Sequence, residues 1–145
     1  DLDPQGNATM GCGVDKRELE LSSYDVLMGN AGIQEAARRL PELGLDLLPA
    51  NADLTGAEVG LLEELGRELR LKLALEPVKA RYSHIIIDCP PSLNMLTVNA
   101  LVAAGSVLIP MQCEYYALEG LSALLATVDQ VRGSVNPKLE LEGIL

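Results

Sequence analysis

Apolar residues along the chain gather in three short, nearly continuous runs, and each run predicts a β-strand. The runs are Leu45–Pro49, Ser83–Asp88 and Ser106–Pro110. None shows the strict alternation of apolar and polar positions that a sheet with one solvent-exposed face requires. Continuous apolar runs are typical of strands that are covered on both faces, as in a parallel sheet.

Helical periodicity fills the stretches between these runs. The predicted helical spans are Ser22–Leu40, Ala57–Arg81, Leu93–Ala104 and Leu118–Arg132. In the second span, Leu61, Leu65 and Leu69 recur every four residues and predict an apolar stripe that packs on the sheet. Pro77 predicts a break in the same span, because proline removes a helix hydrogen-bond donor.

Alternating strands and helices predict an α/β fold with a doubly wound, mostly parallel sheet and helices on both of its faces. The chain opens on Asp1 without methionine and closes on an apolar run that ends at Leu145. We therefore expect the domain formed by residues 1–145 to be incomplete at both ends.

Composition narrows the class of protein. The 145 residues are 48% hydrophobic and 22% charged, which is typical of one globular domain. No apolar stretch is long enough to span a bilayer, so we expect a cytoplasmic protein without membrane contact. The net charge of −10 argues against a broad nucleic-acid surface in this segment. Cys12, Cys89 and Cys113 are widely spaced and predict reduced thiols.

The first candidate site follows the second apolar run, where Ile87 leads directly into Asp88, Cys89, Pro90 and Pro91. In open α/β sheets, ligands bind beyond the carboxyl ends of the strands. A carboxylate at that place can hold Mg²⁺ directly or through water. The alternative is a strand that simply ends at a polar residue, with the prolines preventing its extension.

The second candidate site is the opening segment DLDPQGNAT, in which Asp1 and Asp3 point the same way if the backbone is extended. Paired carboxylates beside a glycine-containing loop could orient a water for attack on a phosphate and help to hold a metal. The alternative is an acidic turn in which Asp3 or Asn7 caps a helix.

These segments resemble ParA/Soj chromosome- and plasmid-partitioning ATPases, which are P-loop NTPases of the ParA/MinD group. The similar strings are DLDPQGNATMGCGVD at Asp1–Asp15, YSHIIIDCPPSLNMLTVNAL at Tyr82–Leu101 and VLIPMQCEYYALEGL at Val107–Leu121. They occur in the family's order and cover nearly the whole chain. The first and last strings favour the partitioning branch over the division-site branch.

The resemblance implies ATP and Mg²⁺ as cofactors and assigns roles to residues. Asp3 matches the catalytic aspartate that positions the attacking water, and Asp88 matches the Walker B aspartate that binds Mg²⁺ through water. Asp1 would support the metal shell. The two switch loops would contact the nucleotide through residues of the first loop and the first residues of the second: Pro4, Gln5, Gly6, Asn7, Pro90 and Pro91.

The resemblance also implies partners. The intact protein would form a homodimer with ATP, bind DNA without sequence preference through regions outside this chain, and meet a ParB-type partner that stimulates hydrolysis. Its expected location is the cytoplasm, in association with the nucleoid. The role of Cys113–Gly120 stays open between the nucleotide pocket, the dimer contact and packing beneath a helix.

One family element is missing from the sequence. The phosphate-binding Walker A loop needs a lysine after glycine, but Lys16, Lys72, Lys79 and Lys138 follow Asp, Leu, Val and Pro. We therefore expect the 145-residue chain alone to be inactive. One alternative is a non-catalytic relative that acts as an interaction module. Another is the related iron–sulfur reductase branch, with Cys89 and Cys113 as ligands.

Overall fold

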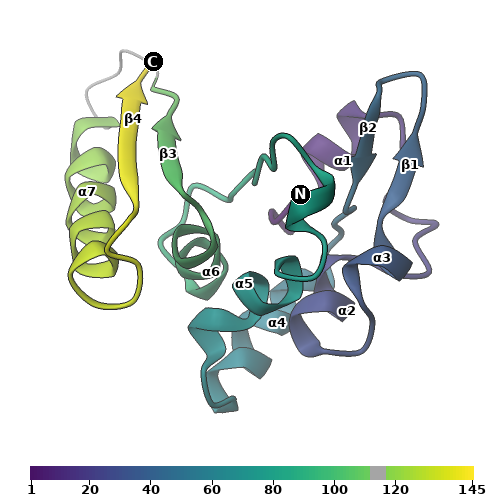
Figure 1. Cartoon of the computed structure of the whole chain (residues 1–145), viewed down its shortest axis with the longest axis horizontal. Helices are drawn as coiled ribbons and strands as arrows, with labels where there is room; N and C mark the ends of the chain where they lie inside the picture. Colours follow the sequence, from purple (N-terminus) through teal and green to yellow (C-terminus); the bar gives the residue numbers. More distant parts are fainter. Residues whose placement is uncertain (112–116) are drawn as a thin grey trace.

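The computed structural model describes the backbone of residues 1–111 and 117–145 and the side chains of residues 1–111 and 120–145. Figure 1 shows the β1–β2 hairpin at one end of the molecule and the β3–β4 pair with α7 at the other, with α6 between them. The short helices α2, α4 and α5 lie together along one side of the middle region.

Helices account for most of the regular structure. The α-helices are α1 (Asn7–Gly11), α2 (Ser23–Met28), α3 (Ile33–Ala36), α4 (Leu54–Gly60), α5 (Arg70–Leu75), α6 (Met95–Ala103) and α7 (Ala117–Ser134). Short 3₁₀ turns accompany them at η1 (Leu61–Glu63), η2 (Arg67–Leu69) and η3 (Lys79–Arg81). No helix in the described ranges is both long and apolar enough to cross a membrane.

Within the described residues, the strands form two separate two-stranded ladders: β1 (Arg38–Leu40) with β2 (Leu45–Leu47), and β3 (Ser106–Ile109) with β4 (Glu140–Ile144). The first pair is antiparallel and the second is parallel, with a register shift between Val107 and Leu108. Two predicted strands are thus confirmed, although β2 pairs with an antiparallel neighbour rather than a parallel one. The tight turn before it, with Gly44 at φ +67°, brings β1 back alongside β2.

The third predicted strand, Ser83–Asp88, is not part of a ladder in the described residues. A strand exists through hydrogen bonds to a neighbour, and this run makes one such backbone bond, from the Leu2 N–H to the Asp88 carbonyl at 2.9 Å. Its side chains are correspondingly open, since Ile86 is 90% exposed. The apolar run predicted a strand here, but in the described residues no neighbouring strand pairs with it.

The predicted helix Ser22–Leu40 is divided into α2, α3 and β1. Ser22 begins α2 in a capping box with Asp25, as its sequence indicates. Gly29 then ends α2 at φ +77°, a left-handed conformation that glycine adopts at little cost. Glu35 accepts a hydrogen bond from the Gly32 N–H and starts α3 anew.

The predicted span Ala57–Arg81 is also interrupted, between Glu63 and Arg67. Gly66 lies at φ +65° there, so the leucine stripe loses its register. Leu61 is fully buried, but Leu65 is 97% exposed, which corrects the prediction that it packs on the sheet. The break at Pro77 is confirmed, because α5 ends at Leu75 and the chain resumes as η3.

The two remaining helix predictions are confirmed by α6 and α7. The main core gathers apolar side chains from the N-terminal segment, α2, α4, α5 and α6: Leu2, Leu27, Ala50, Leu54, Ala57, Leu61, Leu71, Leu96 and Ala100. A second cluster joins α6 to α7 and the start of β4 through Leu101, Val102, Val128, Val131 and Leu139.

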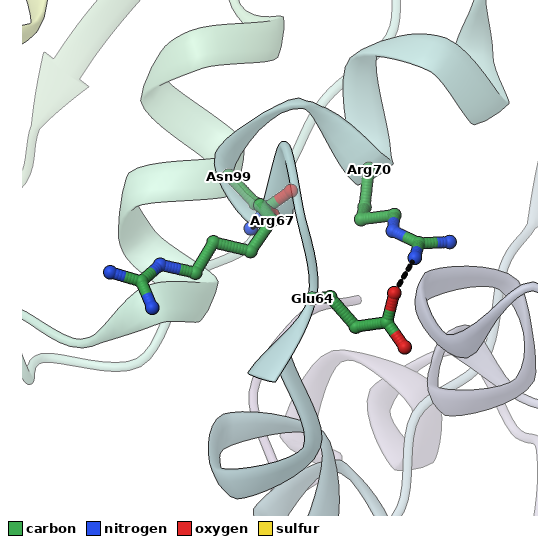
Figure 2. A network of polar contacts seen from close by, with 4 residues as sticks. All are labelled: Glu64, Arg67, Arg70 and Asn99. Atoms are coloured by element: carbon green, nitrogen blue, oxygen red, sulfur yellow. Dashed lines mark hydrogen bonds and ion pairs between the residues drawn. The ribbon is translucent and has the colours of Figure 1, made fainter. Parts of the chain in front are cut away.

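A buried asparagine on α6 holds the broken span in place (Figure 2). The Asn99 side chain accepts a hydrogen bond from the Leu71 N–H at 3.1 Å and donates to the Arg67 carbonyl at 2.8 Å. It therefore supplies partners to backbone groups that the break leaves without helical ones. Close by, Arg70 forms an ion pair with Glu64.

Candidate functional site

The opening segment and the residues around Asp88 lie side by side. The backbone bond between Leu2 and Asp88 joins them, and Leu2 is buried with only 2% exposure. The alternation of an extended backbone leaves Asp1 and Asp3 partly exposed on either side of Leu2. The structure therefore brings three predicted site residues, Asp1, Asp3 and Asp88, into one region.

Asp3 heads the turn that leads into α1. Its Oδ1 accepts a hydrogen bond from the Gln5 N–H at 2.9 Å, and its carbonyl accepts one from the Gly6 N–H at 2.8 Å. This is an acidic turn of the kind that aspartate favours. Neither Asp3 nor Asn7 caps α1 through its side chain, because Gly6 occupies the N-cap position without a side-chain bond.

Gly6 is required by a close approach of two backbones. It lies at φ +60°, and a Cβ atom there would be 2.6 Å from the Ala50 carbonyl oxygen. Glycine alone satisfies both conditions without strain. The other predicted loop residues lie at the surface around it: Pro4 is half-buried, whereas Gln5 and Asn7 are exposed. Lys16 covers the loop and donates a hydrogen bond to the Gln5 carbonyl.

Asp1 does not project freely into solvent. Its Oδ2 accepts hydrogen bonds from the Thr9 N–H at 2.8 Å and from the Thr9 hydroxyl at 2.7 Å, and its Oδ1 accepts one from the Asp3 N–H at 3.1 Å. The carboxylate thus satisfies an amide at the start of α1, in the role of a capping group.

Asp88 differs from the other two aspartates. It is exposed, and its carboxylate has no hydrogen-bond or ion-pair partner among the described residues. The neighbouring Cys89 is partly buried, and burial, followed by the charge of Asp88, raises the pKa of the Cys89 thiol to about 11. In the turn after Asp88, Pro90 is buried and Pro91 is exposed. The turn therefore enters the interior at Cys89 and Pro90 and returns to the surface at Pro91.

The end of this turn is fixed to α6 and α4. Asn94 caps α6 by accepting hydrogen bonds from the Leu96 and Thr97 N–H groups at 3.0 and 3.2 Å. Its Nδ2 donates to Ser92 Oγ at 3.1 Å and to Glu58 on α4. The Thr97 hydroxyl in turn donates to the Ser92 carbonyl at 2.6 Å, which ties the turn to the first turn of α6.

The donor set suits a metal that is shared with a ligand rather than one held by protein alone. Within residues 1–111 and 120–145, no three His, Cys, Asp or Glu side chains are arranged to hold a metal ion. Mg²⁺ in phosphoryl-transfer sites is bound by one or two carboxylates together with phosphates and water. The unpartnered carboxylate of Asp88 therefore fits Mg²⁺ on the chemistry of its oxygens.

Four residues that hold the site were not predicted from the sequence: Thr9, Lys16, Glu58 and Asn94. Asn94 stands before the apolar helix Met95–Ala103, which is an N-cap signal that the sequence carries. No local signal marks the others, because their partners are distant along the chain: Thr9 contacts Ala50, and Glu58 contacts Asn94.

The predictions for Cys113–Gly120 lie largely outside the described residues, which leave out 112–116. The structure thus tests neither the predicted alternatives for this segment nor the alternative in which Cys89 and Cys113 are iron–sulfur ligands. Cys12 and Cys89 are free thiols, in agreement with the prediction for these two.

Comparison with known proteins identifies the family. A family model described as an AAA domain matches residues 1–141. The chain belongs to this AAA domain family. Within it, the chain is 52% identical over 145 residues to the sporulation initiation inhibitor protein Soj of Bacillus subtilis and 49% identical over 147 residues to the chromosome partitioning protein ParA of Caulobacter vibrioides. The predicted ParA/Soj resemblance is confirmed.

The α/β fold class of this AAA domain chain is confirmed by solved structures. The crystal structure of cobyrinic acid a,c-diamide synthase from Mycobacterium smegmatis with bound ADP and magnesium matches with a TM-score of 0.95 and 46% identity. The match covers all of this chain and 59% of that one. The chain likewise covers 57% of Soj and 55% of ParA, so it spans about half the length of these relatives.

Proposed function

We propose that this chain is part of a ParA-type partitioning ATPase that acts in chromosome or plasmid segregation. The observation that supports this most strongly is the junction of Leu2 with Asp88, which sets the acidic loop of the ParA/Soj-like opening segment beside the exposed Asp88. Residues 1–145 would supply both switch loops of the ATPase domain, and the phosphate-binding loop would come from outside this chain.

Asp3 and Asp88 have separate roles in this proposal. Asp3 would orient the attacking water, since its Oδ1 is fixed by Gln5 while its other oxygen accepts no hydrogen bond from the described residues. Asp88 would bind Mg²⁺ through water. When bound, Mg²⁺ neutralises charge that develops on the phosphates. Pro4, Gln5, Gly6 and Asn7 of the first loop, with Pro90 and Pro91 of the second, would lie against the nucleotide.

In this proposal, the intact protein forms a homodimer with ATP and associates with the nucleoid in the cytoplasm. The net charge of −10 supports placing the non-specific DNA contacts outside this chain, since phosphate binding depends on clustered lysine and arginine. A ParB-type partner would stimulate hydrolysis to ADP and phosphate.

The test compares ADP release by this chain and by the extended protein, meaning the chain lengthened through its own reading frame to the size of its relatives. With Mg²⁺ present, we expect turnover in the extended protein only. Absence of ADP release by both proteins would favour the non-catalytic interaction module instead. A parallel reaction with cobyrinic acid would reveal the activity named for the M. smegmatis structure, if turnover required that substrate.

The roles are separated by single variants of the extended protein. We expect Asp3→Ala to lower hydrolysis by about 100-fold or more while ATP binding is retained, as for loss of a group that positions or activates the nucleophile. Asp15→Ala is the matched control, because Asp15 is an exposed aspartate of the same segment whose carboxylate, among the described residues, accepts a hydrogen bond from the Arg17 N–H alone. Loss of ATP binding in Asp3→Ala would refute the assigned role.

A further inference from the structure

A continuous chain of hydrogen bonds runs from Asp1 into the interior. Thr9 is fully buried, and its hydroxyl donates to Asp1 Oδ2 at 2.7 Å. The same Thr9 oxygen accepts a hydrogen bond from the Ala50 N–H at 2.9 Å. Ala50 is itself fully buried in the main core. The carboxylate of Asp1 is thereby connected through one side chain to the main core.

Both ends of the loop that carries Asp3 are held by these hydrogen bonds. On the near side, Asp1 Oδ1 accepts the Asp3 N–H at 3.1 Å, which fixes the backbone of Asp3 itself. On the far side, Asp1 Oδ2 holds the Thr9 amide, which fixes the start of α1. Between them, Gly6 lies against the Ala50 carbonyl. Removal of the Thr9 hydroxyl would leave the Ala50 amide without its partner and loosen the loop from its support.

We propose that Asp1 and Thr9 form a positioning pair that sets the location of Asp3, and that Asp1 acts within this pair rather than as part of the metal shell. This rests on the proposed function, since it assigns a task to Asp3. Three donors converge on the Asp1 carboxylate, and coordination of a metal would compete with them. Asp88, whose carboxylate has no partner in the described residues, is the better placed of the two to bind a cation.

The test uses the extended protein with Thr9→Val, which keeps the side-chain volume but removes the hydroxyl, and Thr9→Ser, which keeps the hydroxyl. ATP hydrolysis is measured over a range of ATP and Mg²⁺ concentrations. We expect Thr9→Val to lower kcat by about 10- to 100-fold, the scale of a misplaced catalytic group, with KM and the Mg²⁺ concentration for half-maximal activity little changed. Thr9→Ser should restore most of the activity.

Asp1→Asn and the double variant Asp1→Asn/Thr9→Val complete the cycle. A pair that acts as one unit is strongly non-additive, so the double variant should be no slower than Asp1→Asn alone. The proposal is overturned if Asp1→Asn raises the Mg²⁺ requirement while Thr9→Val behaves as the unsubstituted protein. That result would place Asp1 in the metal shell.

Hydrogen exchange of the backbone amides separates this inference from the proposed function. If the extended protein hydrolyses no ATP, the proposed function fails, but the positioning pair is still testable in the protein without nucleotide. Thr9→Val should then speed exchange at the amides of Asp3, Thr9 and Ala50, relative to Thr9→Ser. Equal exchange in the two variants would overturn the pair whatever the activity.

Discussion

The two halves of the candidate site are held in different ways. The loop from Asp3 to Thr9 is held at several points, by Asp1, by Lys16 and by the backbone at Ala50. The run Ile85–Asp88 next to it has one backbone bond to Leu2 and borders an open, mainly apolar pocket of about 350 Å³. Both segments supply a predicted catalytic or metal-binding aspartate.

The different surroundings of Asp3 and Asp88 suit the different roles proposed for their carboxylates. In the proposed roles, a group that orients a water must be held within a fraction of an ångström, and the contacts around Asp3 suit that role. A group that binds a hydrated cation tolerates more freedom, and Asp88 keeps its oxygens unengaged among the described residues. The turn after Asp88 is fixed instead at its end, where Ser92 and Asn94 meet α6.

The loop's contact with Ala50 gives the largest expected effect on stability. Gly6→Ala combines a left-handed backbone with a Cβ atom 2.6 Å from the Ala50 oxygen. We expect it to lower the free energy of unfolding of the extended protein by about 2–4 kcal/mol, measured by urea denaturation.

Gly13→Ala is the matched control for Gly6. Gly13 has φ +80°, but a Cβ atom there would meet nothing within 4 Å. Its cost should be the backbone term alone, about 1–2 kcal/mol. Equal losses in both variants would show that the close approach to Ala50 contributes nothing.

The buried side of the second segment is tested by the reactivity of Cys89. Its pKa of about 11, against an ordinary value of 9.0, leaves little thiolate at pH 8. In a variant with Cys12→Ser and Cys113→Ser, alkylation by iodoacetamide should be about 100-fold slower than for an unperturbed thiol, since each pH unit is a factor of ten. The rate should rise with pH up to about 11.

The raised pKa of Cys89 also makes the stability of the folded protein depend on pH. The folded protein favours the neutral Cys89 thiol, so this contribution is fully present below pH 9 and is lost as pH rises toward 11. The control for the alkylation experiment is the reaction with iodoacetamide in concentrated urea, where unfolding exposes Cys89. Rapid labelling of the folded protein at pH 8 would contradict the burial of Cys89 beside Asp88.

The attachment of the turn to α6 is tested at Asn94. Asn94→Ala removes the N-cap of α6 and the bonds to Ser92 and Glu58, so we expect a loss of about 1–2 kcal/mol in urea denaturation. Asn94→Ser retains a capping oxygen without placing a second carboxylate against Glu58, and it should lose less than Asn94→Ala. An equal loss would show that the contacts with Ser92 and Glu58, and not the cap, dominate.

The smallest effect is expected at Tyr82, which directly precedes the run Ser83–Asp88. The Tyr82 hydroxyl donates to Asp46 Oδ2 at 2.8 Å, and this hydrogen bond raises the pKa of Tyr82. Because the pair is exposed, Tyr82→Phe should cost about 0.5 kcal/mol or less in urea denaturation. Tyr24→Phe is the control, since its hydroxyl has no partner in the described residues. A loss above that of the control by more than 1 kcal/mol would indicate that this contact anchors the whole run.

Much of the site could be anticipated because its signals are local. A carboxylate after an apolar run and an acidic segment with Gly6 stand out in the sequence, and the structure places Asp3 and Asp88 together. Their catalytic and metal-binding roles stay predictions. Helices α6 and α7 were predicted for the same reason, since their periodicity lies within the helices themselves.

The errors arose where distant contacts decide the outcome. Leu65 fits the apolar stripe, but the left-handed Gly66 beside it turns the side chain into solvent. Arg38–Leu40 fits a helix, but pairing with Leu45–Leu47 makes it a strand. Ser83–Asp88 has the composition of a buried strand, but a strand also needs neighbours that supply hydrogen bonds.

The sequence by itself determined the class of fold, the family resemblance and the residue types of the site, because these depend on composition, spacing and order along the chain. The tertiary structure decided which groups meet. Thr9 reaches Ala50 across 41 positions, and Asn94 reaches Glu58 across 36. Hydrogen bonds act over about 3 Å of space regardless of sequence separation, so only the folded chain shows that Asp1 holds the loop of Asp3.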